Sequence, residues 1–457
     1  MVAIVSLIIS FGLGKILNPI EFGLYGLILS FIAVNTAIFD GFGGGVSKFI
    51  SEGFDAEDVK RKSLLAFFSI SLIIFVFYLF FSDFIAFLLG DLNLIPYIQL
   101  TALILFFHAF FVVYQNYFNG LKLFKWQSIT AISLTLFKLI LVFLFIFLGF
   151  SVFGVIYGIL FAYLPCLIFL FIYFRKKPVL VSFSLKKLFD FSWPLMVFSL
   201  LMVFLMSADI FFVKALSDKG VADLFTGYYT AASIISKLPY ILILSISSVL
   251  FPTVSSLSSK GNKENLVQFL RKFNKFCLIA VVPLVVLISS TSEELISLLF
   301  SSSLAEGSAA LSILVFGKAF FSLFLLFSSV VIAYGNSRMP LLFIIVAFIC
   351  NFFLSIVLIP SYGLIGAAVA STLSMFFVFL LITGYSYKLI GKIFVLDSTF
   401  KIIFSGVLVF FISFLFPASS VFLLPKYIFL ILFYLLILYF FKEFKLNDLS
   451  LLKSKLI

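Results

Sequence analysis

Two long apolar runs joined by a tight turn occupy Gly335–Ala370, and this stretch constrains the fold most. The first run follows Pro340 and ends at the turn Pro360-Ser-Tyr-Gly363, and the second run opens at Gly366. Proline suits the first turn of a helix, where its missing N–H is not needed, and Pro-x-x-Gly favours a chain reversal. Because about 20 apolar residues span a bilayer, the stretch predicts a hairpin of two transmembrane helices.

A weaker copy of this hairpin lies at Gly120–Gly158, where Lys125 and Gly154 correspond to Arg338 and Gly366. Internal repetition on this scale indicates a duplicated architecture. Six spans in each half would return the chain to the same side of the membrane, so the two repeats are predicted to be parallel. The predicted domains are an N-terminal six-helix half (1–176), a cytoplasmic connector (177–190), a C-terminal six-helix half (191–390), and two additional transmembrane helices with a cytoplasmic tail (391–457).

The composition leads to the same class of protein. Hydrophobic residues make up 64% of the 457 residues and charged residues only 11%, which is too little charge for the surface of a soluble domain. We predict an all-α polytopic membrane protein with about 14 transmembrane helices, two parallel six-helix repeats followed by two C-terminal helices. The predicted spans are 2–17, 24–46, 63–88, 98–118, 128–149, 152–174, 192–213, 228–250, 276–298, 310–333, 340–359, 364–385, 401–417 and 426–442.

The net charge of +12 comes mainly from Lys and Arg in the loops after even-numbered spans. The positive-inside rule therefore predicts that both termini are cytoplasmic, and the charge gives no reason to expect nucleic acid. A polar stretch at 255–275 reads as an amphipathic surface helix. Fewer residues precede Lys15 than precede the corresponding Lys214, so we expect about eight more mostly apolar residues upstream of Met1, or else a short first helix.

Several function classes lack their sequence signatures. There is no Gly-x-x-x-x-Gly-Lys-Ser/Thr phosphate loop, which argues against an ATPase. Cys166, Cys277 and Cys350 lie in apolar runs without metal-ligand spacing, so we expect reduced thiols, no metal and no cofactor. No outer loop is large enough for a catalytic domain. The chain is therefore predicted not to be an enzyme.

Lysines within the spans are the first candidates for a substrate site. A charge at mid-bilayer costs about 2.5–3.5 kcal/mol on insertion scales, so it normally faces a cavity or a partner. Lys237 is a candidate on the eighth span, beside Pro239, which weakens the local helix. Lys318 and Lys138 are candidates on the tenth and fifth spans, with pairing inside the protein or snorkelling as the alternative. The polar residues at helical spacing on the face of Lys237 are Tyr229, Ser233 and Tyr240.

Four other polar residues within the spans are also candidates for the substrate cavity, although each has a structural interpretation as well: Asp209, His108, Gln115 and Asn351. Asp209 either switches its protonation or binds a cation, or forms a structural salt bridge for which Lys237 is a candidate partner. His108, on one face with Gln115, either relays protons or makes an interhelical hydrogen bond. Asn351 is expected to hold neighbouring helices together. The glycine-rich segment Asp40–Gly45 ends a span and follows no strand, so it predicts helix packing or a hinge.

Motifs of interest lie at four places: Pro19-x-Glu21-Phe22-Gly23-Leu24-Tyr25, Asp209, Gly227-Tyr228-Tyr229, and Asn351 with Pro360-x-Tyr362-Gly363-x-x-Gly366. Together they resemble the MOP exporter superfamily, and within it the Wzx-type polysaccharide-biosynthesis (lipid-linked oligosaccharide) flippases. The resemblance covers essentially the whole chain, and its motifs are moderately specific for the superfamily and weakly specific for the substrate. The resemblance implies a V-shaped cavity between two halves, and movement of a polyprenyl-linked sugar from the cytoplasmic to the outer leaflet.

The resulting prediction is a flippase that moves polyprenyl-(pyro)phosphate-linked oligosaccharide across the plasma membrane of a prokaryote by alternating access. The expected partners are the lipid-linked glycan, membrane lipids, and glycosyltransferases or a polymerase of the same pathway. One alternative is a cation-coupled multidrug exporter, whose cavity should favour carboxylates over lysines. A second alternative is a membrane glycan polymerase. The residues do not specify the glycan, the lipid carrier or the coupling ion.

Overall fold

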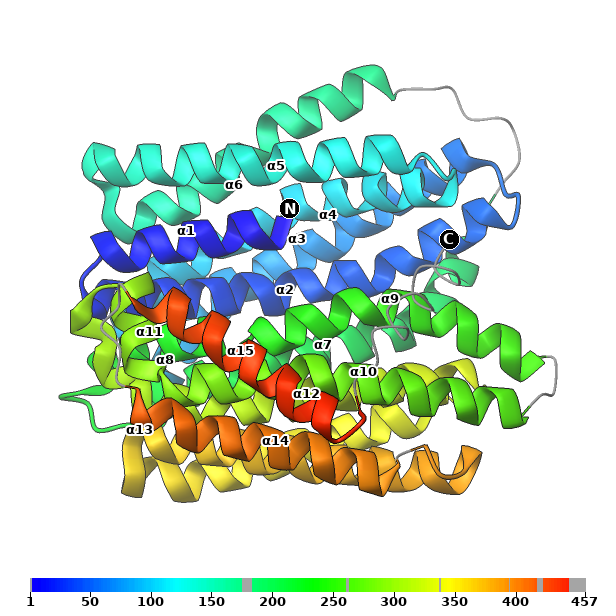
Figure 1. Ribbon diagram of the computed structural model, residues 1–457. Coiled ribbons are helices and arrows are strands. Elements are labelled where there is room, and N and C mark those ends of the chain that lie inside the picture. Colours follow the sequence, from blue (N-terminus) through cyan, green and yellow to red (C-terminus); the bar gives the residue numbers. More distant parts are fainter. Residues whose placement is uncertain are drawn as a thin grey trace. The chain divides into compact units, whose positions relative to one another are not determined.

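The structure, a computed structural model, describes residues 2–174, 183–259, 263–336, 338–393, 395–416 and 422–443. These residues form helices and turns, and no strand occurs among them. Residues 177–182 of the predicted connector and 444–457 of the predicted tail lie outside the described ranges. The helices are α1 (Val2–Ile16), α2 (Pro19–Ser51), α3 (Ala56–Leu88), α4 (Ile95–Gly120), α5 (Phe124–Phe145), α6 (Ser151–Tyr173), α7 (Leu185–Leu216), α8 (Ala222–Ser236), α9 (Leu238–Ser259), α10 (Lys263–Ser290), α11 (Ser292–Leu299), α12 (Ser308–Ala333), α13 (Arg338–Ile390), α14 (Leu396–Leu415) and α15 (Leu423–Phe440), with the short helices η1 (Leu92–Leu94), η2 (Ile146–Phe150) and η3 (Ser302–Gly307) (Figure 1).

The chain forms two compact units, Met1–Thr230 (unit 1) and Ala231–Ile457 (unit 2). Helix α7, which the sequence assigned to the second half, packs along α2 within unit 1. Packing therefore groups the helices differently from the predicted repeats, and the division into two six-helix halves joined at 177–190 stays a prediction.

Helix α2 is the centre of unit 1 and packs between α4 and α7. It begins with a capping box, in which the Glu21 N–H donates to Asn18 Oδ1 at 2.9 Å and the Asn18 N–H donates to Glu21 Oε2 at 3.2 Å. Farther along, a Cβ at Gly41 would lie 2.6 Å from the carbonyl oxygen of Leu195 in α7. The glycine-rich segment is thus a close helix contact inside α2, which confirms the packing interpretation.

Both predicted hairpins are present. Helix α13 reverses at Gly363, whose φ of 54° lies in the left-handed region that favours glycine. A Cβ at Gly366 would lie 2.1 Å from the Leu358 carbonyl oxygen, so the returning helix starts in backbone contact with the first. Helices α5 and α6 reverse in the same way at Gly149, with φ 89°. In Figure 1 the α5–α6 turn lies at the left-hand end of unit 1 and the α2–α3 turn at its right-hand end.

Unit 2 is organised around α12, which packs against α13 and α9, while α10 packs against α14. The predicted span 228–250 is divided, because α8 ends at Ser236 and α9 begins at Leu238. Pro239 cannot supply a helical N–H, which accounts for a break at this point. The stretch 255–275, predicted as one amphipathic surface helix, is divided between α9, which runs to Ser259, and α10, which starts at Lys263.

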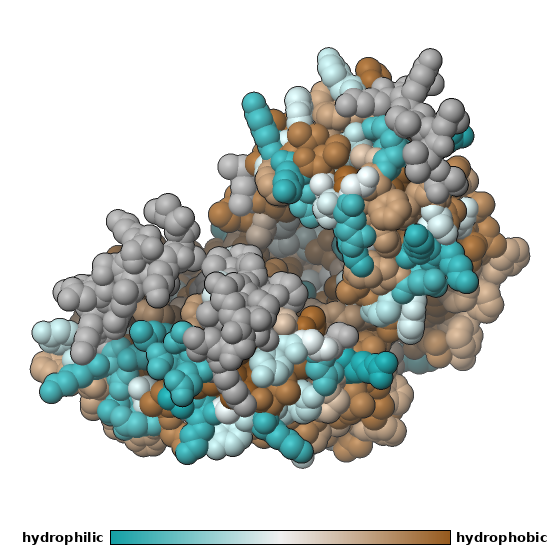
Figure 2. All heavy atoms as spheres, turned by 90° about the vertical axis from the view of Figure 1, so that its right-hand side faces the viewer, coloured by the Kyte–Doolittle hydropathy of each residue, from teal (hydrophilic) through white to brown (hydrophobic). Residues whose placement is uncertain are grey.

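The protein is a multi-pass membrane protein. Among the described residues, ten helices are long and apolar enough to cross a membrane, and two of these ten are the hairpins. Large aromatic side chains such as Phe80 and Phe147 are 78% and 76% exposed, as expected for lipid-facing residues. Figure 2 shows hydrophilic side chains gathered on the face it views and hydrophobic ones along the flanks. The count of fourteen spans stays a prediction.

Candidate functional site

Two of the predicted lysines lie in unit 2. Lys318 is fully buried in the middle of α12, where Ser322 on the next turn is also fully buried. Lys237 is half-buried and occupies the single residue between α8 and α9. Tyr240 follows in α9, with its ring centroid 6.1 Å from that of Phe321 on α12. One lysine therefore lies inside a helix, and the other lies where the predicted span is interrupted.

The third lysine, Lys138, belongs to a polar cluster in unit 1. His108 Nε2 lies 3.1 Å from Asp40 Oδ1, and His108 Nδ1 lies 3.0 Å from the Tyr163 hydroxyl. Lys138 Nζ lies 5.0 Å from the centre of the Tyr163 ring, which is a cation–π distance. Four helices (α2, α4, α5 and α6) thus bring together Asp40, His108, Lys138 and Tyr163, which we call the His108 cluster.

The sequence prediction did not include Asp40 in a site, because it treated this residue as the start of a glycine-rich packing segment. Helix α2 continues for eleven residues beyond Asp40, to Ser51. A carboxylate inside an apolar span of 24–46 was the signal that could have identified it, since acidic residues at membrane depth are rare and usually functional. The glycines that follow Asp40 serve close packing, because a Cβ at Gly41 or Gly43 would approach neighbouring helices too closely. The carboxylate of Asp40, in contrast, faces His108.

Asp209 and Tyr229 lie near each other in unit 1, and both are buried. They come from α7 and α8, the helices on either side of the turn at 217–221. Ser233 is also buried, one turn farther along α8 but assigned to unit 2. The proposed pairing of Asp209 with Lys237 stays a prediction.

Gln115 and Asn351 make interhelical hydrogen bonds. The Gln115 amide donates to Thr130 Oγ1 of α5 at 2.7 Å, so it does not extend the His108 cluster along α4. The Asn351 amide donates to Ser374 Oγ at 3.2 Å, across the two arms of the α13 hairpin. This confirms that Asn351 holds neighbouring helices together.

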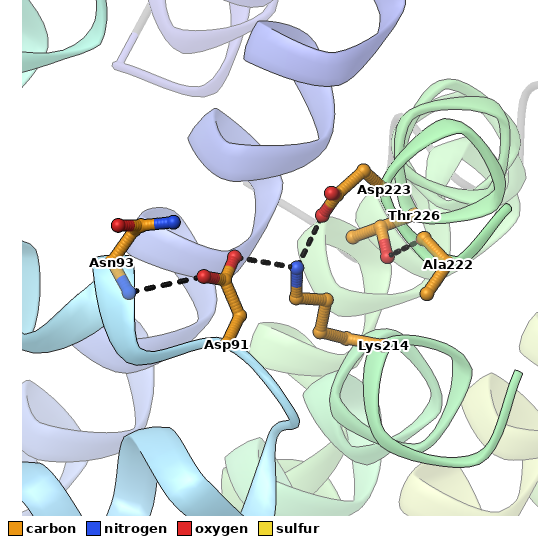
Figure 3. A network of polar contacts seen from close by, with 6 residues as sticks. All are labelled: Asp91, Asn93, Lys214, Ala222, Asp223 and Thr226. Carbon is orange, nitrogen blue, oxygen red and sulfur yellow. Dashed lines mark hydrogen bonds and ion pairs between the residues drawn. The ribbon is translucent and has the colours of Figure 1, made fainter. Parts of the chain in front are cut away.

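An ion-pair network that the sequence analysis did not anticipate lies around Lys214 (Figure 3). Lys214 Nζ, at the end of α7, donates to Asp91 Oδ2 at 2.8 Å and also to Asp223 in the first turn of α8. Burial alone would raise the pKa of Asp91, but the hydrogen bond and the charge of Lys214 lower it overall. In the sequence, Lys214 stood out only as the counterpart of Lys15. Nothing in the sequence indicated that it would pair with Asp91, 123 residues away, and with Asp223, 9 residues away.

At the other end of unit 1, the start of α3 holds the last part of the predicted connector. Asp58 Oδ2 accepts a hydrogen bond from the Phe183 N–H, and Lys62 Nζ donates to the Phe183 carbonyl oxygen, each at 2.5 Å. Phe183 is 3% exposed and packs against Phe49 and Phe54. The entry to α7 is therefore fixed to α3 by both backbone groups of one residue.

Among the described residues, no group of three or more His, Cys, Asp or Glu side chains is placed to hold a metal ion. The polar chemistry within the spans rests instead on lysines, one histidine, tyrosines and two carboxylates. Such groups can bind an anion, exchange a proton, or pair with one another.

Comparisons with known proteins place the chain in a family. The family described as polysaccharide biosynthesis protein matches residues 13–309. The chain is 31% identical to the capsular polysaccharide biosynthesis protein CapF of Staphylococcus aureus over 168 residues, 35% of this chain and 42% of CapF. It is 26% identical to the probable low-salt glycan biosynthesis flippase Agl15 of Haloferax volcanii over 148 residues, 32% of this chain and 31% of Agl15. These matches thus span less than half of each relative.

Two solved structures share the fold over most of their length. One is a lipid II flippase MurJ in an inward closed conformation, with TM-score 0.79 and 18% identity over 97% of both chains. The other is a multidrug resistance MATE family transporter of the MOP superfamily in an inward-facing conformation. It has TM-score 0.72 and 17% identity over 86% of this chain and 95% of the transporter. The expected MOP fold is thereby confirmed.

Proposed function

The chain belongs to the polysaccharide biosynthesis protein family, and we propose that it is a flippase for polyprenyl-(pyro)phosphate-linked oligosaccharides in the cytoplasmic membrane of a prokaryote. The observation that carries the proposal is the family match over residues 13–309. The likeness in fold to a lipid II flippase over nearly the whole chain supports it. Membrane lipids and the enzymes that make or polymerise the glycan are the partners that this function requires.

Lysines within the spans would hold the phosphate of the substrate. Lys318 is completely buried and Lys237 half-buried, and a buried ammonium group interacts more strongly with a phosphate than an exposed one, because Coulomb energy rises as the dielectric constant falls. Lys138 is the corresponding cation of unit 1. Hydroxyl groups on α8 and α9, such as those of Tyr229, Ser233 and Tyr240, would bind the sugar by hydrogen bonds while the polyprenyl tail stays in lipid.

Transport would proceed by alternating access, with the headgroup exposed first to the cytoplasmic and then to the outer leaflet. Such a cycle needs parts that are rigid in themselves and a substrate site that both leaflets can reach in turn. The close α2–α7 contact at Gly41 and the hydrogen bonds of Phe183 to α3 support a unit 1 that moves as one body.

A reconstitution assay tests the function. The purified protein in liposomes should translocate a fluorescent polyprenyl-diphosphate sugar, measured as the fraction of label that an impermeant quencher can no longer reach. Protein-free liposomes and liposomes with an unrelated membrane protein are the controls. Translocation at the rate of these controls would reject the proposal.

A cation-coupled multidrug exporter is a second candidate, favoured by one observation. The Asp40 side chain is 56% exposed within α2, and an exposed carboxylate within a span suits a cationic substrate. The MATE transporter fold likeness is compatible with this function. Accumulation of a cationic dye in the same liposomes, without translocation of the diphosphate sugar, would favour the exporter.

A further inference from the structure

The hydrogen bonds of the His108 cluster are compatible with two protonation states of the His108 ring, which differ at Nδ1. An ionised carboxylate can only accept hydrogen bonds, so His108 Nε2, at 3.1 Å from Asp40 Oδ1, carries a hydrogen. Nδ1, at 3.0 Å from the Tyr163 hydroxyl, either accepts from the tyrosine or donates to it. In the first case the imidazole is neutral, and in the second it holds one additional proton. Histidine is the side chain that ordinarily changes charge between pH 5 and 8.

The carboxylate of this pair is exposed on unit 1. The Asp40 side chain is 56% exposed, whereas that of His108 is only 14% exposed. Asp40 lies inside the apolar span 24–46, where a carboxylate turned toward hydrocarbon would carry a large cost. Its exposed side therefore borders a water-accessible space along unit 1. The negative charge of Asp40 repels an anion in that space.

Lys138 is the cation of the same cluster, and its charge interacts with that of Asp40. With a neutral His108, the cluster has one positive and one negative charge. A proton on His108 pairs with Asp40 and leaves Lys138 as the uncompensated charge. Protonation thus removes the repulsion that Asp40 exerts on an anion without moving any helix.

Cys166 of α6 is a further titratable side chain near the cluster, and it interacts electrostatically with Lys138. On α2 itself, Lys48 lies two turns beyond Asp40 and interacts with Glu52. Apart from Asp209, the charged residues on the other described helices of unit 1 lie toward helix ends. They are Lys15 on α1, residues 57–62 and Asp83 on α3, Lys125 on α5, Lys186, Lys187, Asp190 and Lys214 on α7, and Asp223 on α8.

We propose that Asp40 and His108 form a proton-binding site that controls whether unit 1 accepts an anionic phosphate headgroup at Lys138. The inference rests on the proposed function, since it names the phosphate of that substrate as the ligand. One proton moves from water to His108 Nδ1, and the Tyr163 hydroxyl changes from donor to acceptor. By linkage, headgroup binding must also promote proton uptake by the same factor.

Binding of farnesyl diphosphate, a short polyprenyl diphosphate, to the purified full chain tests the proposal by calorimetry at pH 5.5 and pH 7. Wild type should bind about 10-fold more tightly at pH 5.5, which corresponds to a change of about one pKa unit on binding. Asp40→Asn should bind tightly at both pH values, because the repulsion is gone. His108→Gln should bind weakly at both, because Asp40 stays charged. Binding at pH 7 should take up protons in wild type, seen as a dependence of the binding enthalpy on the buffer.

Opposite effects of Asp40→Asn and His108→Gln distinguish a switch from a structural bond. A bond that only holds α2 to α4 would be lost in both variants, and both would weaken alike. Asp91→Asn, which removes a carboxylate from the Lys214 network of the same unit, is the matched control and should keep the wild-type pH dependence. The titration of the probe itself is the same in all variants and cancels in the comparison.

Two results overturn the inference. Equal changes in Asp40→Asn and His108→Gln, or a wild-type pH dependence in both, would leave the pair a structural element. If wild type flips the polyprenyl-diphosphate sugar in liposomes in such a case, the inference fails and the proposed function stands. Absence of both flipping and diphosphate binding in a folded protein rejects the two together.

Discussion

The two units differ in the charged side chains that they hold within their helices. Unit 1 joins an acid, a histidine, a lysine and a tyrosine in the His108 cluster, within hydrogen-bonding or cation–π distance of one another. In unit 2, Lys318 is fully buried within α12 and Lys237 lies at a helix break. The acidic residues in the described part of unit 2 lie at helix ends or outside the long helices, at Glu264, Glu293, Glu294, Glu306, Asp397 and Glu443.

This difference indicates that the two units contribute differently to binding of the phosphate. A lysine stays protonated over the physiological range unless its surroundings change strongly, whereas histidine responds to pH. Unit 2 would therefore provide a constant attraction for the phosphate, and unit 1 an attraction that depends on a bound proton. Substitutions in one unit, compared with control substitutions or with the wild type, test this difference.

The largest effect is expected from Lys318→Ala. Flipping of the polyprenyl-diphosphate sugar should fall at least about 100-fold at both pH 6 and pH 8, since the loss of one buried charge–phosphate interaction is worth 2–5 kcal/mol or more. Lys237→Ala should act in the same direction. Lys318→Arg should keep part of the activity, because the charge remains while its geometry changes.

Lys388→Ala, at an exposed position in the last turn of α13, is the control and should flip at the wild-type rate. Removal of the Asp209 charge in the Lys318→Ala background should not restore activity. If it does, or if Lys318→Ala flips normally, the lysine has a structural role and the exporter alternative gains weight.

A smaller effect, on stability, is expected from breaking the ion network of each unit. Lys214→Met leaves Asp91 and Asp223 facing each other without the cation, and should cost about 2 kcal/mol, below the 3–5 kcal/mol of a fully buried pair because Asp223 is half exposed. Lys275→Met in unit 2 should cost less, because Glu443 keeps Lys401 nearby. Thermal unfolding in detergent measures both. If Lys275→Met loses as much stability as Lys214→Met, or more, the two ion networks do not distinguish the units.

A still smaller effect should appear in the acid dependence of stability. The pKa of Asp91 is lowered in the folded protein, so its contribution to stability is present above the ordinary value of about 4 and is lost as the pH falls below it. The stability of wild type should therefore decrease more steeply than that of Asp91→Asn between about pH 4 and pH 3. Parallel curves for the two proteins would show that the pair with Lys214 has no energetic role.

The smallest perturbation, a single cysteine, tests whether both units have the same orientation. In a background without Cys166, Cys277 and Cys350, cysteine at Glu52 of unit 1 or Lys392 of unit 2 should react only with a cytoplasmic reagent. Cysteine at Lys219 or Ser302 should react only from outside. Labelling of Glu52→Cys and Lys392→Cys from opposite sides would contradict the parallel repeats.

Much of the helical framework could be predicted from the sequence, because each span is marked by local signals. Apolar length sets the helices, and the Pro360–Gly363 turn sets the α13 hairpin, where Gly363 has the positive φ that the turn requires. Pro239 indicated weakness in the eighth span, and the helix does break beside it at Lys237. The packing of α7 against α2 was not predictable from repeats alone, because it depends on contacts such as Gly41 with Leu195.

The candidate site was predictable only in its residue types. Lys138 and His108 were identified because polar groups within a span are costly, but their meeting at Tyr163 depends on the relative rotation of three helices, which no local pattern encodes. Asp40 and His108 are 68 residues apart. The glycines that follow Asp40 favoured a packing or hinge interpretation of its segment and not a functional role for the carboxylate. The Lys214 network likewise joins a helix end to two turns that only the fold brings together.

The central claim is that the protein recognises the phosphate of a lipid-linked glycan. The most direct test compares translocation by the reconstituted wild-type protein of two fluorescent glycolipids with the same glycan and polyprenyl chain. One carries a diphosphate linkage and the other a neutral ether linkage. The account predicts that the diphosphate lipid is flipped at least about 10-fold faster, as expected when charge–phosphate contacts are lost with the neutral lipid. Equal rates for the two lipids would contradict it.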